Sequence, residues 1–157
     1  MFPPVAFRIV THWRVTGKVA DAARILSAAK DFPRWWGDVY LDVKTIAQGD
    51  ENGIGQTIAV HSKGWLPYRL NWQGTLTESH MPHSWSIDAT GDLQGHGTWT
   101  LTQLGDQTDI TYDWHVTTDR LLFRLIAPLM KGLMISNHNW AMAKGEAGLR
   151  AELARQP

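Results

Sequence analysis

Apolar and polar residues alternate along most of the first 118 positions, the pattern of strands with one buried face. The alternation begins in residues 7–15, where Phe7, Ile9, Trp13 and Val15 are separated by polar side chains. It returns in six further segments, residues 39–46, 56–63, 68–78, 84–89, 93–102 and 109–118. Turn-forming sequences such as DENGIG, SHMPHS and LGDQ join several of them. The pattern therefore predicts seven strands in one antiparallel sheet.

Two segments have a helical period instead. Between residues 19 and 30 apolar side chains recur every three or four positions, and Asp31 to Pro33 ends the pattern, which predicts a short helix or helix pair after the first strand. From Asp119 onward the helical period returns, and Pro128 is expected to divide a short helix near residues 120–127 from a long one over about 128–153. One stripe of the long helix is expected to face the sheet, and it consists of Met134, His138, Ala141, Gly145 and Gly148 or Leu149.

The alternation also assigns the residues of the concave face of the sheet. These are Val39, Leu41, Val43, Ile58, Val60, Tyr68, Leu70, Trp72, Leu76, Trp85, Ile87, Leu93, Trp99, Leu101, Ile110, Tyr112, Trp114 and Val116. Gly74, Gly95 and Gly97 fall on the same face, and we interpret them as bends or bulges of a sheet that curls. A curled sheet with a long helix predicts a cavity between them.

Length and charge narrow the class of protein. The 157 residues are enough for one domain, which we place over residues 1–157. The 15 basic and 15 acidic residues balance, so the chain has no basic field for nucleic acid. The absence of cysteine fits a reducing compartment, and no secretion signal is seen at the N-terminus, so we expect a cytoplasmic protein. The apolar run LLFRLIAPLMKGLMI is too short to span a membrane, and we expect no stable insertion.

Four separated motifs resemble one known family. They are PRWW at 33–36, GDLQGHGTWTL at 91–101, ITYDWHV at 110–116 and NHNWAMAKGEAGL at 137–149. They look like the bacterial polyketide cyclase or dehydrase and lipid transport branch of the START-like superfamily, which includes the pollen-allergen-like proteins. The resemblance implies an α+β helix-grip fold, in which a seven-stranded curved antiparallel sheet wraps around a long C-terminal helix, with short helices after the first strand. An up-and-down lipocalin barrel is the alternative, but it would not place helices after the first strand.

The candidate ligand-binding residues come from the concave face and the inward stripe of the long helix. His138 is the titratable group on that stripe, and a neutral imidazole there is suited to a ligand hydrogen bond, to proton transfer, or to a structural role in the core. We expect an aromatic wall with polar edges, to which Met134 adds an apolar contact. The wall consists of Tyr68, Tyr112, Trp72, Trp99 and Trp114. Gln56 and Asn137 are weaker polar candidates.

The other histidines do not predict a metal site. His96 and His115 are expected to oppose each other across a hairpin, with His12 on the neighbouring strand, but on the outer face of the sheet. His80 and His83 lie in a turn. The carboxylates also point outward, namely Asp42, Asp88, Asp109 and Asp113. We find no catalytic motif and expect neither a metal nor a cofactor.

Two classes of function remain from the sequence. The first is a binding module for a hydrophobic or aromatic small molecule such as a lipid, an isoprenoid or a polyketide-like compound, with a mobile gate near Trp65 to Tyr68 or in the DFPRWW turn. The second is a cyclase or dehydrase-type enzyme that uses the same cavity, in which His138 with Tyr112 or Tyr68 moves protons. The resemblance also leaves open a co-chaperone or a quinone chaperone. Ligand identity and oligomeric state are not predicted.

Overall fold

The structure is a computed structural model that describes residues 5–65, 69–118 and 121–155, with side chains described for 8–65, 69–117 and 132–155. Seven strands are present, and they are β1 (Val5–Thr16), β2 (Tyr40–Ala47), β3 (Thr57–Lys63), β4 (Arg69–His80), β5 (Ser84–Gly91), β6 (Gln94–Leu104) and β7 (Gln107–Thr118). Helix α1 (Val19–Ser27), a 3-10 turn η1 (Ala29–Asp31) and helix α2 (Phe32–Trp35) follow β1, and helix α3 (Leu121–Ala154) ends the chain.

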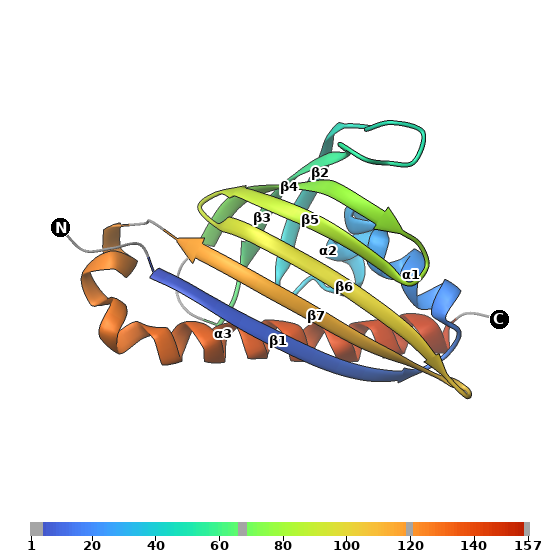
Figure 1. Ribbon diagram of the computed structural model, residues 1–157. Helices are drawn as coiled ribbons and strands as arrows, with labels where there is room; N and C mark the ends of the chain where they lie inside the picture. The colour runs from blue at the N-terminus through green and yellow to red at the C-terminus, as the bar shows by residue number, and fades with distance from the viewer. Residues whose placement is uncertain (1–4, 66–68, 119–120, 156–157) are drawn as a thin grey trace.

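All seven strands form one antiparallel sheet in the order β1-β7-β6-β5-β4-β3-β2. Figure 1 shows the sheet curving over α3, which runs along its length on the concave side. The predicted strands agree with the observed ones to within two residues at nearly every end, and the short helices follow β1 as expected. The predicted helix-grip arrangement of an α+β protein is therefore confirmed.

Among the described residues, the predicted concave face is confirmed with one correction in β2, and Tyr68 of the predicted set lies outside them. Tyr40 lies opposite Ser62 and Val43 opposite Val60, so one extra residue separates Tyr40 from the regular ladder. The irregularity turns Tyr40 onto the concave face, although strict alternation assigned that face to Leu41. Leu41 is only partly buried and is not part of the core cluster, whereas Tyr40 packs against it.

No β-bulge lies at Gly95 or Gly97, because β6 keeps a regular register with both β5 and β7 at these positions, and a bend there stays a prediction. Both glycines instead permit close packing. A β-carbon on Gly97 would overlap the hydroxyl of Tyr112, and one on Gly95 would overlap the backbone of β7 at His115. The irregularity in β4 also lies beyond Gly74, between Leu76 and Glu78. The sheet thus curves without a bulge at these glycines.

Helix α3 is one continuous helix from Leu121 to Ala154, where the sequence predicted two helices separated at Pro128. Figure 1 shows its orange N-terminal part bent away from the axis of the rest. A proline inside a helix removes one backbone hydrogen bond and bends the helix without having to end it. The predicted inward stripe is confirmed by burial, since Met134, Gly145 and Leu149 are buried.

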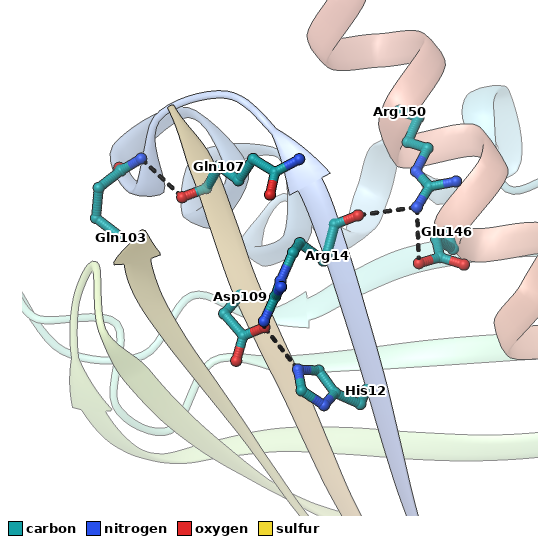
Figure 2. Close-up of polar contacts among 7 residues, drawn as sticks. All are labelled: His12, Arg14, Gln103, Gln107, Asp109, Glu146 and Arg150. Atoms are coloured by element: carbon teal, nitrogen blue, oxygen red, sulfur yellow. Dashed lines mark hydrogen bonds and ion pairs between the residues drawn. The ribbon is translucent and has the colours of Figure 1, made fainter. Parts of the chain in front are cut away.

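The C-terminal half of α3 is fastened to the edge of the sheet and to α2. Figure 2 shows Arg150 between Glu146 and β1, where its Nη2 donates to the carbonyl oxygen of Arg14 at 2.8 Å. Arg34 of α2 donates two hydrogen bonds to the buried carboxylate of Glu152, at 2.8 and 2.9 Å. The first contact holds α3 along β1, and the second holds it against α2. Within the described part of the chain, no helix has the length and apolar character needed to cross a membrane.

Candidate functional site

A cavity of about 510 Å³ lies between the concave face of the sheet and α3. The sheet contributes most of its wall, and the helix closes it from the other side. The apolar and aromatic lining residues include Leu26, Phe32, Trp36, Val39, Ile58, Leu70, Trp72, Leu76, Trp85, Ile87, Leu93, Trp99, Trp114, Val116, Met134, Ala141 and Met142. Pockets of 300 to 1,000 Å³ with this kind of lining are typical of small-molecule sites.

Six of the seven predicted site residues line this cavity, and they are Trp72, Trp99, Tyr112, Trp114, Met134 and His138. The first four come from β4, β6 and β7, and the last two come from α3. The seventh, Tyr68, lies outside the described residues. Gln56 and Asn137, the weaker polar candidates, also line the cavity.

The aromatic side chains of β5, β6 and β7 form a stacked row along the wall. Trp85 stacks on Trp99 with ring centroids 6.1 Å apart, Trp99 on Tyr112 at 4.2 Å, and Tyr112 on Trp114 at 5.8 Å. All three pairs are within 28° of parallel. Because side chains stand away from the sheet and the Trp99 and Tyr112 rings cover one another's faces, this pair presents ring edges to the cavity. Ring edges favour contact with the face of an aromatic ligand.

His138 lies on the helix side of the cavity in an apolar environment. Burial lowers the pKa of its imidazole from 6.5 to about 4, so the side chain is neutral near pH 7. Its Nε2 is enclosed by protein atoms and has no hydrogen-bond partner in the described part of the chain. The residue thus contributes a neutral polar ring to the lining, with one nitrogen covered in this conformation.

Several polar side chains of the lining are already hydrogen-bonded. The indole Nε1 of Trp72 donates to Ser62 Oγ at 3.0 Å, and Asn137 Oδ1 accepts from the backbone N–H of Trp65 at 2.8 Å. Trp36 Nε1 donates to the carbonyl oxygen of Ala141 at 2.9 Å. These bonds fix the walls and join the helix to α2 and to the segment after β3.

Tyr40 is a lining residue that sequence reasoning missed. It follows the Trp35-Trp36-Gly37-Asp38 turn, and its ring packs on Phe32 and on Trp36, each with centroids 4.9 Å apart. Strict alternation placed its side chain outside, and the irregularity at Leu41 has no signature in a single sequence. The only available signal was its position beside an aromatic turn that was itself a candidate gate.

One of the two candidate gate segments, the DFPRWW turn, borders the cavity. Lys30, Phe32 and Trp36 of the DFPRWW region line it, together with Asn52 and Gly53 from the loop between β2 and β3. Of the other candidate segment, Trp65 to Tyr68, the structure describes Trp65, which is 46% exposed and follows the lining residue Gly64. Movement of either segment stays a prediction.

The outward histidines lie close to carboxylates on the convex side of the sheet. His96 lies directly opposite His115, as predicted, and their nitrogens are 2.6 Å from Asp88 and 3.2 Å from Asp113, respectively. Figure 2 shows His12 with Asp109, 2.6 Å apart. This hydrogen bond holds the pKa of the Asp109 carboxyl below its usual value. Among the described residues, no group of three or more histidine, cysteine or carboxylate side chains is arranged around a common metal position.

A second charged contact on this face joins the edge strand to its neighbour. Arg8 donates two hydrogen bonds to Asp113, at 3.0 and 2.8 Å, and these bonds lower the pKa of the Asp113 carboxyl. The predicted outward carboxylates Asp42 and Asp88 are exposed. The acidic side chains predicted to face water are therefore directed away from the cavity.

No family model matches the chain, and no curated protein matches its sequence. Solved structures do match its fold. An aromatase/cyclase, Zhui, from a Streptomyces species has a TM-score of 0.76 at 11% identity, with 96% of this chain and 94% of that chain covered. A START superfamily protein from Mycobacterium smegmatis has a TM-score of 0.77 at 10% identity, with 94% and 97% covered. A norcoclaurine synthase from Thalictrum flavum has a TM-score of 0.62 at 17% identity, with 97% and 98% covered. The chain thus has the START-like helix-grip fold that its motifs predicted.

Proposed function

We propose that the protein binds a hydrophobic or aromatic small molecule between the sheet and α3. The observation that carries the proposal is the cavity of about 510 Å³, whose lining is dominated by apolar and aromatic side chains from both elements. A packed core would leave no such volume, because protein interiors normally contain few voids larger than a water molecule. The occupant we expect is a lipid, an isoprenoid or a polyketide-like compound. A cytoplasmic location stays a prediction from the sequence.

The proposal is tested by filling the cavity from the helix side. Ala141 lines the cavity, whereas Ala143 two residues later is exposed on the same helix. With the neutral fluorescent probe N-phenyl-1-naphthylamine, Ala141→Phe is expected to weaken binding by about tenfold or more, since the added ring occupies the ligand volume. Ala143→Phe adds the same ring outside the cavity and should leave the probe affinity unchanged.

Both variants must first give the cooperative unfolding of the wild-type protein. Equal weakening by the two substitutions, or no effect of Ala141→Phe, would refute binding in this cavity. Native mass spectrometry of the gently purified protein then identifies any natural ligand. An apolar adduct that is present on wild type and Ala143→Phe and absent from Ala141→Phe would give the ligand class.

A cyclase or dehydrase-type reaction in the same cavity is the second candidate. It is supported by the phenols of Tyr40 and Tyr112 and the neutral imidazole of His138 in the lining, which are groups able to move or hold a proton. One of the similar structures is an aromatase/cyclase. Binding alone requires no catalytic groups, so it is the function we place first.

A further inference from the structure

Two phenol hydroxyls in the cavity have no hydrogen-bond partner in the described part of the chain. They belong to Tyr112 of β7 and Tyr40 of β2, and both residues line the cavity. The hydroxyl of Thr11 also lacks a partner, but it is enclosed by protein atoms, whereas the two phenol oxygens are not. Both phenol hydroxyls are thus unpaired polar groups of the wall that remain accessible to a molecule in the cavity.

Packing fixes the position of both rings. Tyr112 lies between Trp99 and Trp114, and its hydroxyl occupies the space that Gly97 leaves on the floor of the sheet. Tyr40 is held by Phe32 and Trp36. Donors that are already oriented lose little conformational entropy when a ligand binds. These two hydroxyls are therefore suited to select a ligand by hydrogen bonding.

Both groups are neutral donors. Burial raises the pKa of both phenols, and the proximity of Tyr40 raises that of Tyr112 further, so both keep their protons at neutral pH. Strands β2 and β7 lie on different sides of the curved sheet, so the hydroxyls approach the cavity from two directions. A carbonyl oxygen has two lone pairs and accepts two such bonds. A ligand hydroxyl can accept the same two bonds, but its own proton then needs an acceptor elsewhere in the lining.

We propose that the cavity selects a neutral ligand whose apolar body carries a carbonyl group, and that the hydroxyls of Tyr112 and Tyr40 both donate to that oxygen. The inference rests on the proposed function, since it names the chemistry of the molecule bound in the same cavity. The tyrosines are specificity-determining residues in this scheme. The stacked row of Trp85, Trp99, Tyr112 and Trp114 holds the apolar body.

The test compares 1-tetralone with tetralin, which have nearly the same shape and differ by one carbonyl oxygen. The dissociation constant of each is measured by calorimetry for wild type, Tyr112→Phe and Tyr40→Phe. For each variant we take the ratio of the two dissociation constants. The two probes differ in their free energy of transfer from water, but this difference is the same for every variant and cancels when the ratios are compared. Each substitution is expected to reduce the preference for the ketone by about three- to tenfold, the value of one hydrogen bond.

Thr11→Val is the matched control. Thr11 pairs with Tyr112 across β1 and β7 but does not line the cavity. The substitution removes one unpaired hydroxyl outside the cavity, so the ketone preference should not change. An unchanged tetralin affinity shows that each tyrosine variant keeps the cavity intact. If either Tyr112→Phe or Tyr40→Phe leaves the ketone preference unchanged, the proposal that both hydroxyls donate to the ligand oxygen is overturned. The proposed binding function would still stand. If neither probe binds the wild-type protein, both the carbonyl proposal and the proposed binding function are overturned.

Discussion

At the scale of single residues, the side chain of Thr11 lowers the stability of the fold. Its hydroxyl is enclosed on the concave side of β1 without a partner in the described part of the chain. An unpaired buried hydroxyl costs about 1 to 3 kcal/mol. Thr11→Val keeps the branched shape that suits a strand and is expected to raise the free energy of unfolding by about 1 kcal/mol in chemical denaturation.

Thr98→Val provides the contrast, because the Thr98 hydroxyl is hydrogen-bonded to Ser86 Oγ at 3.0 Å. The same substitution there should lower the stability. If Thr11→Val is destabilised to the same extent as Thr98→Val, the Thr11 hydroxyl has a partner in solution.

Residue-level prediction from the sequence worked where alternation is regular and failed where it is interrupted. Trp72, Trp99, Tyr112 and Trp114 lie in unbroken ladders, so a period of two gave the correct face for each of them. Tyr40 lies beside the one-residue irregularity of β2. The extra residue moves the side chains on one side of it to the opposite face of the sheet. Such an irregularity depends on the pairing of β2 with β3 and has no local sequence signal.

At the scale of elements, the contact between α3 and the two N-terminal tryptophans depends on small residues. A β-carbon on Gly145 would overlap the indole ring of Trp36, which is buried and tethered to the carbonyl oxygen of Ala141. Trp13 of β1 approaches the same point. Gly145→Ala is therefore expected to lower the free energy of unfolding by about 1 to 3 kcal/mol, despite the higher helix propensity of alanine.

Gly132→Ala is the matched control on the same helix, since a β-carbon there meets no atom within 4 Å. Alanine at that exposed site should raise the stability by up to about 1 kcal/mol. Thermal unfolding of both variants separates packing from propensity. If Gly145→Ala is as stable as Gly132→Ala, helix α3 can shift away from α2 without a loss in the free energy of unfolding.

The same contact explains which part of the helical segment was predictable. The spacing of Met134, Gly145 and Leu149 indicated the buried stripe because a period of 3.6 brings these residues to one face. The end of the helix was not predictable from Pro128, because proline removes one hydrogen bond whether the helix stops or bends. The PRWW motif contains Trp35 and Trp36, but the sequence alone does not indicate what they pack against. The structure identifies that partner, since Gly148 packs against Trp35 and Gly145 against Trp36.

At the scale of the whole molecule, the cavity is a property of the curved sheet and α3 together. Helix α3 lies nearest to β1, so the strands farther across the sheet face open volume. The sequence predicted a cavity from the curl and the helix, but its size depends on how the tryptophan rings are oriented. Trp99 and Tyr112 stack on each other along the wall at 4.2 Å. Stacking keeps them beside the cavity, and face assignment alone does not reveal such an orientation.

The cavity also gives the whole fold a dependence on pH through His138. Burial lowers its pKa from 6.5 to about 4 in the folded protein. Between these values the unfolded chain binds a proton that the folded protein does not, so the free energy of unfolding falls as the pH falls. From pH 7.5 to pH 5 the expected loss is about 2 kcal/mol. The carboxylates Asp109, Asp113 and Glu152 have lowered pKa values and lose their contributions only at more acidic pH.

Urea unfolding at pH 7.5, 6.5, 5.5 and 5 measures this loss. His138→Leu removes the titrating group from its apolar site and should abolish most of the decrease. His83→Leu is the control, because His83 is exposed, and it should keep the wild-type pH dependence. An equal decrease in wild type and His138→Leu would mean that water or a partner group reaches the imidazole and lets it charge within the fold. His138 would then be a solvated polar group of the cavity, which would change the chemistry that a ligand meets on the helix side.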